Sequence, residues 1–88
     1  MKRKIARIQQ MEEYFDKVLT IYYTESRAIK EDAEIQRMLH ELEQYLESGQ
    51  WLSDYESDER GELPKELKRG VLSEDGLYNL LCNIEEIK

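Results

Sequence analysis

Residues 35–49, IQRMLHELEQYLESG, carry the clearest helical pattern in this chain of 88 residues. Apolar side chains recur there every three or four positions, which is the spacing of one helical face: Ile35, Met38, Leu39, Leu42, Tyr45 and Leu46. Gly49 follows directly, at the position expected for the end of a helix. The pattern predicts a helix over about 34–48.

A longer stripe with the same spacing precedes this helix and predicts another over about 4–30. Its apolar positions are Ile5, Ile8, Met11, Phe15, Val18, Leu19 and Tyr22. The stripe weakens toward the charged run Lys30-Glu31-Asp32, so we place a turn at 30–33. Because no Gly or Pro occurs before Gly49, one continuous helix to residue 48 is the alternative.

Short helical segments are predicted in the acidic stretch that follows Trp51. Ser53 and Glu56 have the spacing of a capping box, which predicts a short helix over 54–59. Residues 64–69 resemble one helical turn that begins at a proline and is followed by a glycine.

The final helix is predicted over 74–87, with Ser73 as its N-cap. Glu74 and Asp75 fall in its first turn, where negative charge is favourable. Its apolar positions are Leu77, Leu80, Leu81, Ile84 and Ile87.

These elements predict one all-α domain over 1–88: a long helical hairpin, an acidic connector with short turns, and a final helix packing on the hairpin. At 1.5 Å per residue the first helix would be about 40 Å long and the second about 22 Å. The first helix would therefore overhang by about 18 Å, with Ile5, Ile8 and Met11 uncovered. We expect the final helix or a second chain to cover them.

The net charge of -7 is local. Residues 41–62 hold eight acidic side chains and one basic, whereas the first acid after the basic residues Lys2, Arg3, Lys4 and Arg7 is Glu12. A hairpin would bring this basic start near the acidic 47–62 connector, so mutual attraction is expected to explain both clusters. The acidic balance argues against direct nucleic-acid binding.

Other composition features predict a cytoplasmic chain without a membrane span or a secretory signal. The longest apolar run, 18–23, is far short of the roughly 20 residues that a membrane-spanning helix needs. The single cysteine, Cys82, excludes an internal disulfide framework and is typical of a reducing compartment.

The C-terminal half carries a specific pattern: Trp51-Leu52, Asp54-Tyr55-Glu56, and then Leu63-Pro64-x-x-Leu67-Lys68-Arg69-Gly70-Val71-Leu72-Ser73-Glu74-Asp75-x-x-Tyr78-x-Leu80-Leu81. This pattern resembles a small bacterial domain family known only as a domain of unknown function. Arg7-Ile8-x-x-Met11-Glu12 is similar to the opening of that family, and the resemblance is loose across 20–45. It implies a small helical cytoplasmic protein and does not point to any particular activity.

No metal, cofactor or catalytic site is predicted. Asp54, Glu56 and Asp58 match the first positions of a calcium loop, but Glu59 stands where glycine is required and Lys65 where glutamate is required. His40 has no second histidine near it, and Cys82 has no basic neighbour to activate it. A phosphate site before the final helix is disfavoured by the acids at its start.

We therefore expect a non-enzymatic protein–protein interaction domain that self-associates, as a homodimer or another homo-oligomer. The alternative is an acidic modulator or inhibitor that occupies a basic site of a nucleic-acid-binding protein. A third hypothesis is a small enzyme or ligand-binding protein with its site around 51–78. The candidate interaction surface is Trp51, Asp54, Tyr55, Glu56, Asp58, Glu59, Arg69 and Tyr78. Aromatic residues such as Trp51 are also typical of a thin core.

Overall fold

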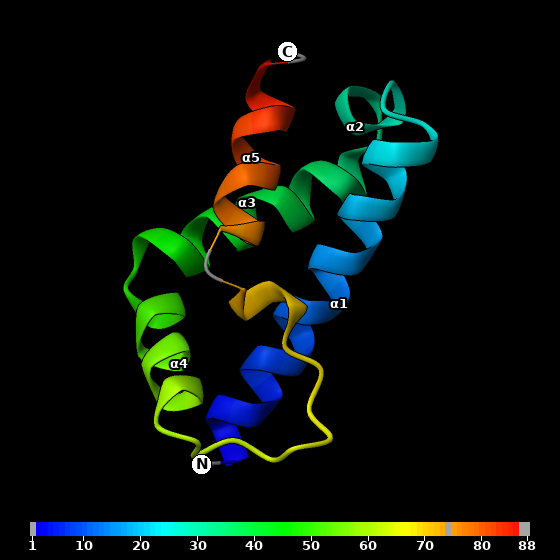
Figure 1. Ribbon diagram of the computed structural model, residues 1–88. Helices are drawn as coiled ribbons and strands as arrows, with labels where there is room; N and C mark the ends of the chain where they lie inside the picture. Colours follow the sequence, from blue (N-terminus) through cyan, green and yellow to red (C-terminus); the bar gives the residue numbers. More distant parts are fainter. Residues whose placement is uncertain (1, 74, 87–88) are drawn as a thin grey trace.

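The computed structural model describes residues 2–73 and 75–86, and within these ranges it is helical without strands. Figure 1 shows the order of the elements along the chain. They are α1 (Lys2–Thr24), α2 (Ala28–Glu31), α3 (Ala33–Glu47), α4 (Gln50–Glu59), the 3-10 helix η1 (Gly70–Leu72) and α5 (Gly76–Glu86). The predicted all-α class is confirmed.

The hairpin of α1 and α3 is interrupted twice, where the sequence predicted one turn at 30–33. α1 ends at Thr24, six residues before the predicted end at 30, and the one-turn helix α2 follows. Asp32 then caps α3, because its Oδ1 accepts the backbone N–H groups of Glu34 at 2.9 Å and Ile35 at 3.4 Å. The alternative of one continuous helix to residue 48 is wrong.

Gly49 joins α3 directly to α4. Its φ of 88° lies in the left-handed region, which glycine adopts without a steric penalty. The chain therefore changes direction between α3 and α4 (Figure 1), and α4 begins at Gln50, four residues before the predicted start at 54. The predicted capping box at Ser53 is wrong, since the Ser53 N–H donates to the carbonyl of Gly49 at 3.0 Å inside the helix.

Residues 64–69 form a hydrogen-bonded turn and not the predicted helical one. The Leu67 N–H donates to the carbonyl of Pro64 at 3.2 Å, and Leu63 and Leu67 are buried. α5 begins at Gly76, two residues after the predicted start. The predicted roles of Glu74 and Ile87 lie outside the described residues.

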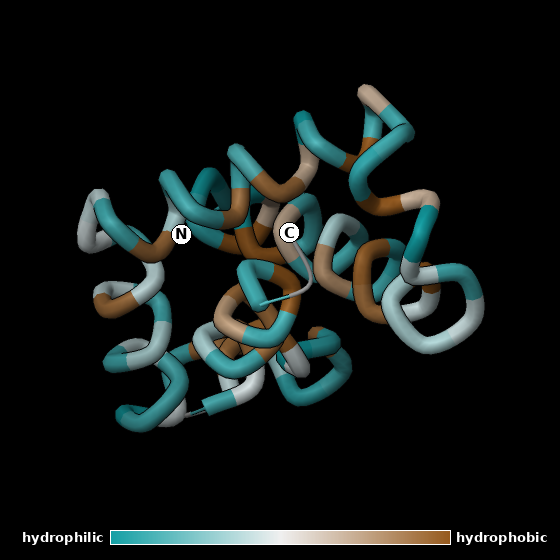
Figure 2. The backbone as a smooth tube through the Cα atoms, turned by 90° about the horizontal axis from the view of Figure 1, so that it is seen from above, coloured by the Kyte–Doolittle hydropathy of each residue, from teal (hydrophilic) through white to brown (hydrophobic). Residues whose placement is uncertain are grey.

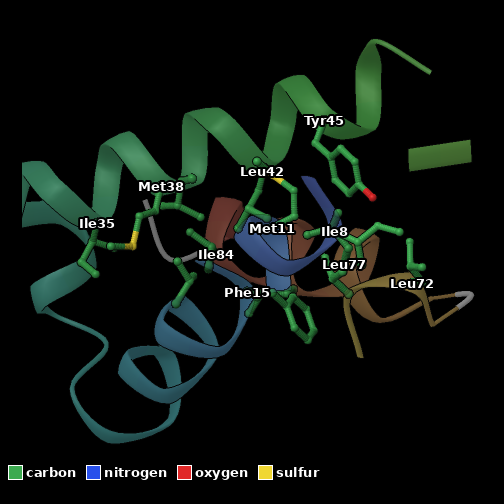
Figure 3. Packing of buried hydrophobic residues seen from close by; sticks show 14 of the residues in the cluster. Ile8, Met11, Phe15, Ile35, Met38, Leu42, Tyr45, Leu72, Leu77 and Ile84 are labelled. Atoms are coloured by element: carbon green, nitrogen blue, oxygen red, sulfur yellow. The ribbon is translucent and has the colours of Figure 1, made fainter. Parts of the chain in front are cut away.

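The overhang of α1 is covered by the chain itself. Ile8 has no exposed surface and Met11 is buried, because η1 packs on α1 while α5 packs on η1, α3 and α1. Figure 3 shows these two side chains of α1 near Leu42 and Tyr45 of α3, with Leu77 of α5 close by. In Figure 2 the hydrophobic segments gather on the inner sides of the helices. The segment before the final helix therefore helps to cover the overhang.

Candidate functional site

Asp54 is the centre of a polar network between the start of α1, the end of α3 and the middle of α4. It is fully buried, although the sequence placed it on a surface. Its Oδ2 accepts the Tyr45 hydroxyl at 2.6 Å and Arg7 Nε at 3.0 Å, and its Oδ1 accepts Arg7 Nη2. The arginine binds both carboxylate oxygens, which is the strongest geometry for such a pair. The network confirms that the basic start meets the acidic connector.

Lys4 extends the contact between α1 and α4 by one helical turn. Its Nζ donates to Ser57 Oγ at 2.6 Å and to Ser53 Oγ at 3.3 Å. Ser57 is also fully buried. Residues three positions apart share a helical face. Lys4 and Arg7 therefore lie on one face of α1, and Asp54 and Ser57 lie on the face of α4 that they contact.

The network changes the acid–base properties of its members. Burial and the hydrogen bond to Asp54 raise the pKa of the Tyr45 hydroxyl well above its ordinary value. The hydrogen bond to Asp54 also raises the pKa of Arg7, which stays charged. Tyr45 is therefore a hydrogen-bond donor and Arg7 a permanent cation at neutral pH.

The backbone of Val71 is held by two side chains from distant parts of the sequence. Oε1 of the buried Glu12, on α1, accepts the Val71 N–H at 2.7 Å. Trp51 Nε1, on α4, donates to the Val71 carbonyl at 2.9 Å. A Cβ at Gly70 would lie 3.2 Å from Glu12 Oε2, so glycine allows this close approach. These bonds anchor η1 between α1 and α4.

Arg69 fastens the turn before η1 to α4. Its guanidinium forms an ion pair with Asp58 and donates to the carbonyls of Pro64 at 2.5 Å and Leu67 at 3.3 Å. One cation therefore neutralises an acid of α4 and satisfies two carbonyls of the turn. Its role in the described structure is to hold the turn in place.

The structure divides the predicted interaction surface into structural and accessible residues. Trp51, Asp54, Asp58 and Arg69 are engaged in the contacts described above. Tyr55 is half-buried and stacks on Trp51, with ring centres 5.0 Å apart. Accessible positions are held by Glu56, Glu59 and Tyr78. A hydrogen bond with Cys82 raises the pKa of the Tyr78 hydroxyl.

Sequence reasoning about candidate sites missed Arg7, Glu12, Tyr45 and Ser57. The apolar spacing correctly predicted that the ring of Tyr45 is buried, but it gives no information on the hydrogen bond of its hydroxyl. Arg7 and Glu12 belong to the segment that resembles the opening of the family, and this was the one signal available for them. Their partners lie 47 and 59 positions away, so no local spacing could identify the pairs.

Two surface grooves run beside α1. The first, of about 480 Å³, lies between α1 and residues 66–68 and is lined by Gln9, Glu12, Glu13, Asp16, Glu66, Leu67 and Lys68. The second, of about 350 Å³, is lined by residues of α1 and by Glu34, Ile35 and Met38. We call the first of these the acidic groove.

The acidic side chains of the described residues serve contacts within the chain or line its surface. Across the described ranges, no three histidine, cysteine or acidic side chains are arranged to hold a metal ion. The buried carboxylates of Asp54 and Glu12 bind groups of the chain itself. Among the helices described, none combines the length and the apolar character needed to cross a bilayer.

Comparison with known proteins identifies a family model that covers most of the chain. A family model described as a domain of unknown function (DUF4298) matches residues 8–88, nearly the whole chain. No curated protein and no solved structure matches the chain. The matched range includes Glu12, Tyr45, Asp54 and Val71, so most of the buried polar contacts described above lie inside it.

Proposed function

The chain belongs to this family, a domain of unknown function (DUF4298), and we propose that it acts there as a non-catalytic protein–protein interaction domain. The observation that carries the proposal is the acidic groove, which is open to solvent and lined by carboxylates, an amide, Leu67 and Lys68. Such a lining can bind a partner through charge and apolar contact but includes no nucleophilic hydroxyl or thiol.

The use of the buried polar residues supports the same proposal. Tyr45 and Asp54 bind each other, Ser57 accepts from Lys4, and Glu12 holds η1. A general base or nucleophile needs an open side toward its substrate. These groups are instead used to join the helices, which leaves the grooves and the exposed side chains for contact with a partner.

Self-association as a homodimer or another homo-oligomer remains part of the proposal, but an uncovered overhang of α1 no longer supports it. The overhang of α1 is covered within the chain, so a second copy is not needed there. Tyr23, Tyr78 and Leu52 are large hydrophobic residues that remain more than half exposed. Sedimentation at micromolar concentration tests this part, and a compact monomer at every concentration contradicts it.

The alternative function, an acidic modulator of a nucleic-acid-binding protein, would depend on fewer free charges than the acidic stretch of the sequence contains. Asp54 and Asp58 are paired with Arg7 and Arg69, which leaves Glu56 and Glu59 exposed on α4. Replacing both with glutamine should abolish binding to a basic partner under this alternative. Unchanged binding contradicts it. We also propose a cytoplasmic location, where the exposed thiol of Cys82 would stay reduced.

Site-specific photo-crosslinking tests the main proposal in cells of the source organism. A photoreactive residue is placed in turn at four exposed positions, each on a different helix: Glu13, His40, Glu56 and Tyr78. We expect a discrete cross-linked protein at one position or two, identified by mass spectrometry. Absence of a protein adduct at all four positions contradicts an interaction domain.

A further inference from the structure

We propose that the acidic groove binds a cationic segment of a partner protein, with an arginine or lysine side chain reaching the Glu12 carboxylate. This inference rests on the proposed function and names the chemistry of the partner. The groove is separate from the acidic 41–62 stretch that dominates the sequence, because it is formed by α1 and residues 66–68.

The Glu12 carboxylate belongs to the lining of this groove and, within the described ranges, uses only one of its two oxygens for a hydrogen bond. The residue is only 8% exposed, and its Oε1 is occupied by the Val71 N–H. Its Oε2 has no hydrogen-bond partner among the residues described. In that part of the chain, every fully enclosed side-chain oxygen or nitrogen has a partner, so Oε2 must be reached by solvent. Because Glu12 is among the residues that line the groove, a cation bound there would lie close to this carboxylate.

The charges around this oxygen are unbalanced. The lining holds four carboxylates, Glu12, Glu13, Asp16 and Glu66, against the single ammonium group of Lys68. None of these carboxylates takes part in the ion pairs found in the described residues, which use Asp54, Asp58 and Glu62. The arginines of these ion pairs thus bind other acids, and the four carboxylates of the groove remain available to a cation of a partner.

The residues that line the groove favour a long cationic side chain. Leu67 contributes apolar surface beside the carboxylates. Arginine and lysine place an apolar stem along such a surface while the charged end reaches an anion. A guanidinium can donate two parallel hydrogen bonds to a carboxylate, so arginine is the best fit for the group at the end of the stem.

Nuclear magnetic resonance titration with a defined probe tests the inference. The probe is the blocked peptide Gly-Arg-Leu-Arg-Gly, added to the full chain at low salt. We expect the amide resonances of residues 9–16 and 66–68 to move most. The same peptide with citrulline in place of both arginines keeps the shape but loses the charge, and it should not bind.

Matched variants separate the groove from general acidity. The double variant Glu13→Gln with Asp16→Asn should weaken peptide binding about fivefold or more, because both charges line the groove. Glu56→Gln with Glu59→Gln removes the same charge from α4 and should change the affinity less than about twofold. Glu12→Gln, which keeps an oxygen for the Val71 N–H, should also weaken binding without lowering the melting temperature.

The results have distinct meanings for the two proposals. Shifts spread evenly over the acidic surface, equal weakening by both double variants, or equally tight binding of spermidine overturn the groove assignment. If photo-crosslinking then yields a protein adduct only at His40, Glu56 or Tyr78, the proposed function stands without the groove. If no position cross-links while the peptide binds the groove, the groove is a cation site and the proposed function fails.

Discussion

Tyr45 donates its hydroxyl to Oδ2 of Asp54 at 2.6 Å in the interior of the protein, and this bond joins α3 to α4. The two residues are separated by nine positions and by the left-handed turn at Gly49. Asp54 in turn holds Arg7, so one carboxylate connects three helices. The stability of the domain should depend on each member of this network.

Alkaline pH should weaken the fold through Tyr45. Its pKa is raised in the folded chain, so its contribution is fully present below about 10, the ordinary pKa of tyrosine. The contribution declines as the pH rises above that value. We expect Tyr45→Phe to lower the free energy of unfolding by about 1–2 kcal/mol at pH 7. In urea denaturation at several pH values, the variant should lose less stability above about pH 10 than the parent.

Tyr23→Phe is the control for this effect, because Tyr23 is 77% exposed. Its stability should follow that of the parent at every pH. Parallel curves for Tyr45→Phe and the parent would show that the buried hydroxyl does not cause the alkaline loss.

Asp54→Asn should be severely destabilising. It removes the negative charge that the Arg7 guanidinium and the Tyr45 hydroxyl face inside the protein. Breaking a buried pair in this way costs about 3–5 kcal/mol, a large part of the stability of a small domain. Circular dichroism during chemical denaturation measures the loss. Glu56→Gln, an exposed change on the same helix, should stay within about 0.5 kcal/mol.

Glu12 and Trp51 should be energetically coupled through the backbone of Val71. Trp51→Phe leaves the Val71 carbonyl without its donor and should cost about 1–2 kcal/mol. Glu12→Ala releases the N–H of the same residue. In a double-mutant cycle we expect a coupling of more than about 0.5 kcal/mol, because either change alone loosens η1. Strict additivity would be evidence that the two bonds act independently.

Replacing Gly49 should destabilise the fold because of its backbone conformation and not because of steric crowding. Its φ is +88°, and a Cβ built there meets no atom within 4 Å. Gly49→Ala should therefore cost about 1–2 kcal/mol in backbone strain, whereas Gly49→Asn should cost less. Thermal melts compare the two variants. Equal melting temperatures for both would contradict the strain explanation.

The periodic parts of the sequence predicted the helices well. The stripe at 35–46 gave α3 within one residue at each end of the predicted 34–48 range. The helix junction at Gly49 could not be placed in the same way. A glycine marks the end of one helix, but the start of α4 depends on a left-handed turn that competes with the capping-box signal at Ser53.

The candidate site shows a different limit of sequence reasoning. A run of acids indicates charge but not which carboxylates face inward. Asp54 is three positions after Trp51, on the same side of α4, and both bind groups of other elements. Glu56 lies on the exposed side. Only the contacts of Arg7 on α1 and Tyr45 on α3 distinguish the buried acid from the exposed one.

The hydrogen bonds of Glu12 and Trp51 to the Val71 backbone have a consequence for the order in which the protein folds. The partners of Val71 are residues 12 and 51, and the chain must reach residue 71 before α1 loses its exposed apolar flank. During synthesis α3 can pack on α1 early, but the flank of α1 that η1 and α5 cover would stay exposed until the last third of the polypeptide is made. The domain should acquire its native structure in one late step, and a truncated product ending before Val71 should be a ready target for chaperones and proteases.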